Sequence, residues 1–416
     1  MKQILPILLL FLMSTAFGQE VNTPSVGASY ANQTFYTLND GSTTSNPHTD
    51  WDIAFDVSQQ GAGVLVNEGV GLSFTSPMSE VELYYNNATD FTTADTSGMT
   101  RIYNTEVEWS TGAFNSIASG SSADLGWGNY DFMTHAINGT KVFFIKLRND
   151  NYKKIEIQSL IQGVYTFRYA DLDGANETTQ TIDKNGYSGK TLAYFSIENE
   201  TALDLEPTNW DLLFTRYSTI LDDNGNPVNY TVTGVLQNTG VEVAQADNIT
   251  PSTVDYNNYL NDFSDSLTVI GHDWKYYAGS WNIETNRVYF IKTATDSIWK
   301  VEFFDFAGSF SGVTTLEKTF ETVLTSTNNL YKNIASFEIF SNPAIDHTNI
   351  AFESTINTDN ATVRIFSLSG QTVFQESMTI QNGLNIKRLN LDLASGQYIL
   401  AVQIGEEVIT KKLLMQ

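Results

Sequence analysis

The sequence contains no cysteine, and this absence removes several kinds of chemistry at once. Disulfides, thiolate metal sites, cysteine nucleophiles and a lipid-modified N-terminal cysteine are all excluded. Histidine is nearly as scarce, with four residues in 416, so catalytic sites built on histidine bases have few side chains to use. No G-x-S-x-G, H-E-x-x-H or P-loop motif occurs. We therefore expect no enzymatic activity. A catalytic pair among the 47 acidic residues stays open, because no short sequence motif points to one.

Basic residues and long apolar runs are also in short supply. The chain has 22 Lys and Arg against 47 Asp and Glu, a net charge of −25, and such a chain repels nucleic-acid phosphates and anionic lipids. The one long apolar stretch runs from Ile4 to Met13. It follows Lys2 and ends in small residues, which predicts a secretory signal peptide over residues 1–18. No later stretch approaches the length of a membrane span, so none is expected in the mature protein.

Residues that favour β-structure are plentiful. The chain is 41% hydrophobic and 12% aromatic, which is enough to build packed cores. Only 17% of the residues are charged, and Asn, Thr, Ser and Gly are common, a mixture typical of β-rich extracellular modules. A length of 416 residues allows two or three domains. We expect an all-β protein.

A phrase in the sequence occurs twice. TDWDIAFDV at residues 49–57 returns as TNWDLLFTR at residues 208–216, an offset of 159, and the same offset carries FYTL at 35–38 onto YFSI at 194–197. A second block, KVFFIK at 141–146, returns as RVYFIK at 287–292, and the strands that follow it match as well. Alternation of apolar and polar residues predicts strands throughout. We infer two tandem copies of one β-rich domain, at residues 27–186 and 187–325.

The repeated Trp-Asp pair has an interpretation in terms of folding. Trp51 and Trp210 lie on the apolar faces of their predicted strands, so each is expected to anchor a core. Asp52 and Asp211 lie on the opposite faces, where they are expected to accept hydrogen bonds from a neighbouring loop. The pair is therefore interpreted as a folding signature of the duplicated domain and not as a ligand site.

The last 80 residues have a different pattern of strands and turns. Short alternating strands are separated by Ser-Gly and Asn-Gly turns, which predicts a small β-sandwich over residues 337–416. The early Asn342-Pro343, the strand VRIFSLSGQTVF, the segment LASGQYIL and the closing ITKKLLMQ resemble the type A C-terminal sorting domain of the type IX secretion system of Bacteroidetes. The resemblance implies a partner in that secretion machinery, export across the outer membrane, and a final location that is secreted or at the cell surface.

The two copies resemble the HmuY family of haem-binding proteins from the same bacteria. The second copy carries the clearer match, through NWDLLFTRY, GHDWKYY, NRVYFIKT and WKVEFFDF, while the first copy keeps DWDIAF, KVFFIK and KKIEI. The resemblance implies an all-β, hand-like fold that clamps a flat ligand between loops without catalysis. It also implies haem as a cofactor and a haemophore-like role.

Haem iron needs side-chain ligands such as His, Met or Tyr in an apolar slot. The second copy has one His, His272, and no Met. The first copy has Met99, Met133 and His135, and these three are our candidate haem ligands. Two other histidines, His48 in a turn and His347 in the sorting domain, are expected to take no part. No metal site beyond haem is predicted, although the Asp- and Asn-rich loops at 171–177 and 222–226 leave calcium open.

The alternative function is binding of something other than haem by the same surface-exposed fold. Aromatic loops such as DLGWGNYDF at 124–132 and GSWN at 279–282 could stack on sugars. The ligand in this interpretation is a glycan or a protein partner, and the protein is an adhesion or binding module. Clustering of Met99, Met133 and His135 around one slot would favour haem, whereas an open aromatic groove would favour the alternative.

Overall fold

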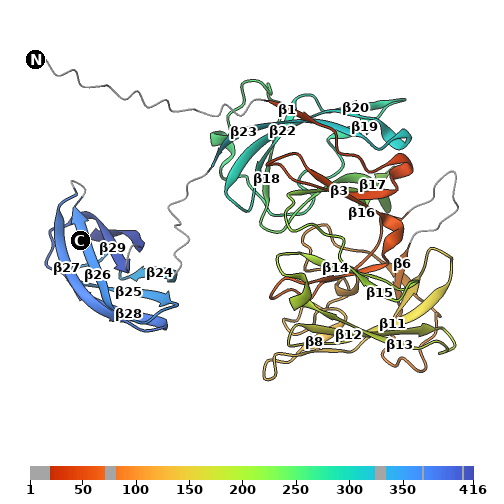
Figure 1. The fold of residues 1–416 in the computed structure, drawn as a ribbon, viewed down its shortest axis with the longest axis horizontal. Helices are drawn as coiled ribbons and strands as arrows, with labels where there is room; N and C mark the ends of the chain where they lie inside the picture. Colours follow the sequence, from red (N-terminus) through yellow and green to blue (C-terminus); the bar gives the residue numbers. More distant parts are fainter. Residues whose placement is uncertain (1–18, 71–80, 324–333, 368–369, 405–406) are drawn as a thin grey trace, which may run out of the picture. The chain divides into compact units, whose positions relative to one another are not determined.

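The computed structural model describes residues 19–70, 81–323, 334–367, 370–404 and 407–416 (Figure 1). The predicted signal peptide at 1–18 lies outside the described residues. Strands make up 52% of the structure and helix 5%, with only short 3-10 turns in the described part, so the all-β expectation is confirmed. None of the described helical segments has the length and apolar character needed to cross a membrane. The chain divides into two compact units, residues 1–324 and 325–416.

The first unit contains two lobes, each built from two sheets around its own apolar core. The first lobe, from β4 to β15, has one sheet in the order β13-β12-β11-β10-β6-β7, joined by the β8–β9 hairpin, and a second in the order β15-β14-β4-β5. Its strands are β4 (Ile53–Asp56), β5 (Val64–Val66), β6 (Glu82–Tyr85), β7 (Thr100–Ile102), β8 (Gly128–Tyr130), β9 (Ile137–Gly139), β10 (Phe143–Lys146), β11 (Tyr152–Ile161), β12 (Val164–Asp171), β13 (Thr178–Asp183), β14 (Leu192–Ser196) and β15 (Thr201–Leu203).

The second lobe takes β1 to β3 from the start of the chain and β16 to β23 from later in it. Its sheets run β1-β23-β22-β21-β18 and β17-β16-β2-β3, and β19 and β20 form a separate hairpin. The strands are β1 (Glu20–Asn22), β2 (Asn32–Tyr36), β3 (Thr43–Pro47), β16 (Leu212–Asp223), β17 (Asn226–Gln237), β18 (Glu242–Asp247), β19 (Lys275–Tyr277), β20 (Trp281–Ile283), β21 (Arg287–Lys292), β22 (Ser297–Phe306) and β23 (Thr314–Val323).

Six 3-10 turns connect these strands within the described residues. They are η1 (Ala28–Tyr30), η2 (His48–Asp50), η3 (Ala113–Asn115), η4 (Lys184–Tyr187), η5 (Tyr256–Tyr259) and η6 (Gly308–Phe310).

The opening strands of the two copies are exchanged. β2 belongs to the first copy by sequence but pairs with β16 of the second, and β14 begins the second copy but pairs with β4 of the first. The registers agree at the repeat offset, because Phe35 pairs with Leu213 where Tyr194 pairs with Ala54. Each lobe therefore contains strands from both sides of the boundary at 186/187.

The second repeated block also folds alike in both copies. β10 pairs with β11 so that Phe144 faces Lys154, and β21 pairs with β22 so that Phe290 faces Lys300, the same register at an offset of 146. Matching sequence, order and register in two separate blocks support the inferred duplication.

The three largest apolar clusters of the first unit are the cores of its two lobes and a cluster between them. The first-lobe core gathers side chains that include Phe55, Trp127, Phe143, Tyr165 and Phe167. The second-lobe core gathers side chains that include Tyr36, Phe214, Trp274, Tyr289 and Phe303. A third cluster, which we call the seam, joins the lobes through Phe35, Trp51, Leu65, Trp109, Leu192, Tyr194, Trp210, Leu213, Tyr217, Leu236 and Leu267.

The second unit is a two-sheet sandwich, as its turn pattern predicts. One sheet runs β24-β25-β28 and the other β27-β26-β29-β30, with an apolar core between them. The strands are β24 (Ile334–Phe340), β25 (His347–Ser354), β26 (Thr358–Ser367), β27 (Thr372–Ile380), β28 (Gly383–Asn390), β29 (Gly396–Ile404) and β30 (Glu407–Met415). The Asn342 side chain holds the terminal strand: its Nδ2 donates to the Lys412 carbonyl at 2.8 Å and its Oδ1 accepts from the Leu414 N–H at 2.9 Å.

Candidate functional site

The repeated Trp-Asp pair locks the exchanged strands in place. Asp211 accepts a hydrogen bond from the Leu38 N–H just after β2, and Asp52 accepts one from the Ile197 N–H just after β14, both at 2.7 Å. This confirms the predicted acceptor role of the two aspartates. Each carboxylate fixes the end of the strand that crosses over from the other copy. The phrase is therefore a structural signature of the exchange.

Burial distinguishes the two carboxylates. Asp52 is fully buried, lies 3.4 Å from the guanidinium of Arg148, and that side chain is itself only 2% exposed. Burial raises the pKa of Asp52, and Arg148 opposes the rise. Burial likewise raises the pKa of Asp211, where the Leu38 N–H and the buried Lys318 oppose the rise. Asp52 forms a buried ion pair with Arg148, whereas Asp211 is held by the Leu38 N–H, so both carboxylates serve the fold.

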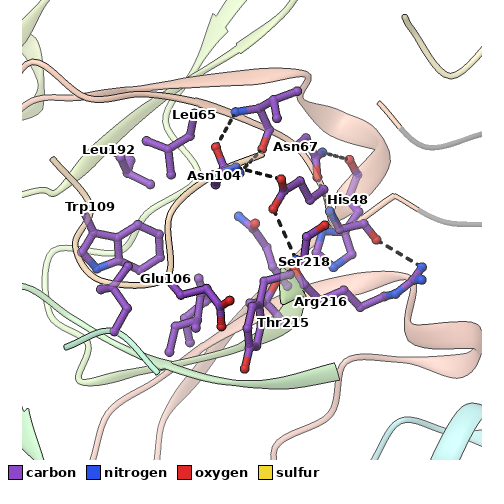
Figure 2. A pocket seen from close by; sticks show the side chains of 18 of the residues that line it. His48, Leu65, Asn67, Asn104, Glu106, Trp109, Leu192, Thr215, Arg216 and Ser218 are labelled. Carbon is purple, nitrogen blue, oxygen red and sulfur yellow. Dashed lines mark hydrogen bonds between the residues drawn. The ribbon is translucent and has the colours of Figure 1, made fainter. Parts of the chain in front are cut away.

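A small cavity lies in the seam between the lobes (Figure 2). Its volume is about 60 Å³, far below the roughly 300–1,000 Å³ of ordinary small-molecule sites. Figure 2 shows Leu65, Leu192 and Trp109 on one side of it and His48 and Arg216 on the other. A cavity of this size cannot hold a haem.

Two buried titratable groups line the seam cavity. Glu68 accepts hydrogen bonds from the N–H of Asn104 at 2.9 Å in the first lobe and of Ser218 at 3.3 Å in the second. Burial raises its pKa to about 7 despite these bonds. Burial, reinforced by the nearby Arg216, lowers the pKa of His48 to about 3, so His48 is neutral at physiological pH. Sequence reasoning assigned His48 to a turn, and no sequence signal pointed to Glu68.

A larger pair of grooves opens on the surface of the first lobe, on either side of Tyr130. One has a volume of about 530 Å³ and the other about 410 Å³, and both are bordered by Gln60, Gly61, Tyr130 and Ile137. We call the two together the Tyr130 groove. Its walls come from the loop after β4, the β8–β9 hairpin and, on one side, the loop between β11 and β12. Tyr130 is half-buried, so part of its ring faces the solvent at the centre.

The rest of the Tyr130 groove is polar. Exposed amides of Gln59, Gln60 and Gln162 line it, and an amide offers both donors and acceptors. Asp124 lies in the smaller groove; partial burial would raise its pKa, but the N–H groups of Ser119 and Gly126 lower it to about 2. The groove thus combines one aromatic face with a fixed carboxylate and several amides.

The three candidate haem ligands come from two different connections. Met133 and His135 lie on the β8–β9 turn, where Met133 is 92% exposed and His135 is exposed with φ of 56°. The Nδ1 atom of His135 lies 2.6 Å from the Tyr130 hydroxyl, which directs the ring into the groove wall. Met99 is half-buried before β7. The described residues around Met133 and His135 do not form the apolar slot that haem requires, so the fit to haem is poor.

The aromatic loops differ in what they expose. In the first, Trp127 is fully buried and donates to the Ala62 carbonyl at 2.9 Å, so it anchors the core and cannot stack on a ligand. In the same loop Phe132 is 64% exposed and packs edge-on against Tyr130 at 5.1 Å. In the second, Trp281 is 37% and Tyr277 66% exposed at the tip of the β19–β20 hairpin, with ring centroids 5.5 Å apart.

Other polar sites offer less. An open cleft of about 940 Å³ is lined mainly by Thr, Ser and Asn side chains, and its aromatic residues Trp210 and Trp299 are each 95% buried. In the loop at 171–177, Asp171 bonds Lys153 and Asn176, and in the loop at 222–226 Asp222 accepts the Gly225 N–H. No group of three or more acidic or histidine side chains suited to a metal ion occurs among the described residues.

Comparison with known proteins identifies the C-terminal unit. Residues 338–416 match the secretion system C-terminal sorting domain, which confirms the predicted sorting domain of the type IX system. The chain is therefore exported to the cell surface or secreted. No curated protein matches the chain. Among solved structures, dimeric latent PorU from Porphyromonas gingivalis is similar at 9% identity and a TM-score of 0.18, over 95% of this chain and 34% of that one, a likeness too weak to carry an argument.

Proposed function

We propose that the protein is a non-catalytic binding protein, exported by the type IX system, whose Tyr130 groove binds a glycan. The observation that carries this is the partly exposed Tyr130 ring between two adjoining grooves of about 530 and 410 Å³, bordered by amides and a carboxylate. A sugar ring has an apolar face of C–H groups that packs on an aromatic ring, and its hydroxyls bond to amides and carboxylates. The resemblance to HmuY-like proteins, which bind through loops, agrees with a site at this place.

Haem is the competing ligand for the same place, since His135 borders the groove. An exposed Met133 and a His135 already engaged with the Tyr130 hydroxyl favour a polar ligand over haem. A haem in this groove would have its iron and its porphyrin faces exposed to water, because the groove walls are polar.

The test is a glycan-array screen of the purified protein, run beside a haemin titration followed by absorbance. We expect binding to a restricted group of oligosaccharides, and we expect Tyr130→Ala to abolish it. The matched control is Tyr277→Ala on the β19–β20 hairpin, which is exposed and aromatic but distant in the fold. Tyr130→Phe, which keeps the ring, should retain most of the binding.

Two outcomes would contradict the glycan proposal. One is a saturable Soret shift that Met99→Ala, Met133→Ala or His135→Ala alters, because that would establish haem ligation at the predicted residues. The other is glycan binding that Tyr277→Ala or Trp281→Ala abolishes while Tyr130→Ala leaves it intact, which would move the site to the β19–β20 hairpin.

The β19–β20 hairpin is a second candidate surface, supported by its own observation. Tyr277, Trp281, Phe306 and Tyr30 form a row of ring contacts with centroid separations of 5.5, 5.1 and 6.0 Å, and Phe310 nearby in η6 is 90% exposed. Exposed aromatic rings on a supported hairpin are typical of a protein-binding surface. A pull-down that Trp281→Ala weakens and Tyr130→Ala does not would assign a protein partner to it.

A further inference from the structure

The two tryptophans of the repeated phrase have different hydrogen-bond partners. The indole N–H of Trp210 donates to Glu206 at 2.9 Å, and the same carboxylate accepts the N–H groups of Thr191 at 2.7 Å and Leu192 at 2.8 Å. At the repeat offset of 159, Pro47 stands in the place of Glu206. The first copy therefore lacks the carboxylate that satisfies the equivalent tryptophan.

Two donors without partners in the first copy belong to residues that line the seam cavity. The indole N–H of Trp51 has no hydrogen-bond partner, and neither does the Gln33 side-chain nitrogen, although both residues are more than nine-tenths buried. The Gln33 amide lies beside the Tyr194 hydroxyl, and the His48 ring lies beside the Asn32 backbone. Neither contact has the geometry of a hydrogen bond. Buried donors without a partner are rare in folded proteins, and a bound species usually satisfies them.

The remaining walls of the cavity are mostly apolar. Side chains of the seam supply them: Leu65, Trp109, Leu192, Leu213, Leu236 and Leu267. A volume of about 60 Å³ corresponds to roughly four to six water-sized positions, so only a small molecule fits. Arg216 is the charged basic group that lines it, His48 is neutral, and Glu68 and Glu106 are the acidic groups, so the site carries no large net charge.

We propose that the seam cavity binds a short aliphatic carboxylate of two to four carbons. Its oxygens accept hydrogen bonds from Trp51 and Gln33, as Glu206 accepts from Trp210 in the second copy, and its carbon chain packs against Leu65, Leu192 and Leu213. The ligand carboxylate is thus the hydrogen-bond acceptor for Trp51 in the first copy, as the Glu206 carboxylate is for Trp210 in the second. This site is separate from the Tyr130 groove and does not depend on glycan binding.

The test is calorimetric titration of the purified protein with sodium butyrate, using butyramide, butanol and hexanoate as comparison compounds. Butyrate should bind saturably with a Kd on the order of 1 mM, since a ligand of six non-hydrogen atoms gains limited free energy. Butyramide and butanol lack the charged acceptor and should bind at least about tenfold more weakly. Hexanoate is too long for the cavity and should not bind.

The deciding variants are Trp51→Phe and its matched control Trp210→Phe. Loss of the Trp51 N–H should weaken butyrate binding by at least about tenfold, while Trp210→Phe should change it by less than about twofold. If Trp51→Phe fails to fold by circular dichroism, Gln33→Leu replaces it and should weaken binding in the same way. Absence of saturable butyrate binding to the unaltered protein would overturn the proposal, leaving a cavity that holds only water. Equal effects of the two tryptophan variants would overturn it as well.

Discussion

The two copies of the Trp-Asp phrase make the same backbone contacts in different surroundings. Asp211 accepts the Leu38 N–H and Asp52 the Ile197 N–H, both at 2.7 Å, and the flanking strands pair in the same register. Asp52 also accepts the Glu198 N–H at 3.3 Å. Near the second tryptophan, Glu206 accepts the Trp210 indole N–H and the backbone N–H groups of Thr191 and Leu192. Near the first tryptophan lies the seam cavity, which buried His48 and Glu68 also line, and the indole N–H of Trp51 has no hydrogen-bond partner.

This difference shows which contacts the exchange depends on. The aspartate bond ends the crossing strand and holds the register, so its loss would separate strands from different parts of the chain. The tryptophan's polar partner is less constrained, because the apolar packing of the indole in the seam does not depend on it. The first copy could therefore diverge around Trp51 while the exchange was preserved.

The largest effect is expected from removing the more buried aspartate. Asp52→Ala should lower the free energy of unfolding by about 2–4 kcal/mol, because it leaves the Ile197 N–H unsatisfied and removes one of two carboxylates from the buried Arg148 guanidinium. Arg148 keeps its pairing with Glu198 at 2.5 Å, which limits the loss. Asp211→Ala should cost less, about 1–3 kcal/mol, because it chiefly leaves the Leu38 N–H unsatisfied. Urea denaturation of both variants measures the difference. Equal losses would mean that the Arg148 pair adds nothing to the shared backbone bond.

The next effect depends on pH and belongs to the first copy alone. The pKa of Glu68 is raised to about 7 when folded, so the folded state binds more protons than the unfolded state between about pH 4.5 and 7. The stability that Glu68 contributes is therefore fully present below pH 4.5 and falls by about 3 kcal/mol as the pH rises through 7.

The measurement is the difference in unfolding free energy between the unaltered protein and Glu68→Gln from pH 4 to pH 8. Taking this difference matters because the lowered pKa of His48 acts in the opposite direction, raising stability as the pH climbs from about 3 to 6.5. A difference that stays flat across the range would show that Glu68 titrates near its ordinary pKa.

A smaller effect separates the two tryptophans. Trp210→Phe should lower the free energy of unfolding by about 1–2 kcal/mol more than Trp51→Phe does, because only Trp210 loses a hydrogen bond to a buried carboxylate. Both variants lose similar amounts of apolar contact in the seam, so each serves as the other's control. Thermal unfolding in a buffer free of carboxylates measures it, and a reversed order would contradict the assigned partners.

The smallest effect is expected outside the seam. Met133→Ala should change the unfolding free energy by less than about 0.5 kcal/mol, because the side chain is 92% exposed. Denaturation of this variant tests the placement of the β8–β9 turn and validates its use in the haemin titration. A loss above 1 kcal/mol would mean that Met133 is packed against other residues.

Much of the fold was predictable from local sequence patterns. Period-two alternation located strands such as β4, β10 and β16, and turn residues marked the sandwich at residues 337–416. The acceptor role of Asp52 and Asp211 followed from their side of the strand. The exchange of β2 and β14 could not be predicted, because both copies carry nearly equivalent strands and either pairing satisfies the same pattern.

The candidate sites divided in the same way. The aromatic loop at 124–132 was found from its composition, but only burial shows that Trp127 faces inward while Tyr130 and Phe132 face the solvent. Glu68 had no sequence signal, because a lone acidic residue after a strand is usually exposed.

Residue type and spacing along the chain were enough to predict the strands, the repeated blocks, the absence of thiol chemistry and the sorting domain for export. The tertiary structure decided which copy each opening strand joins, where the seam leaves a cavity and which aromatic rings reach the solvent. Those outcomes depend on contacts between residues more than a hundred positions apart, such as Asp52 with Ile197, and no local pattern records which of two similar partners is chosen.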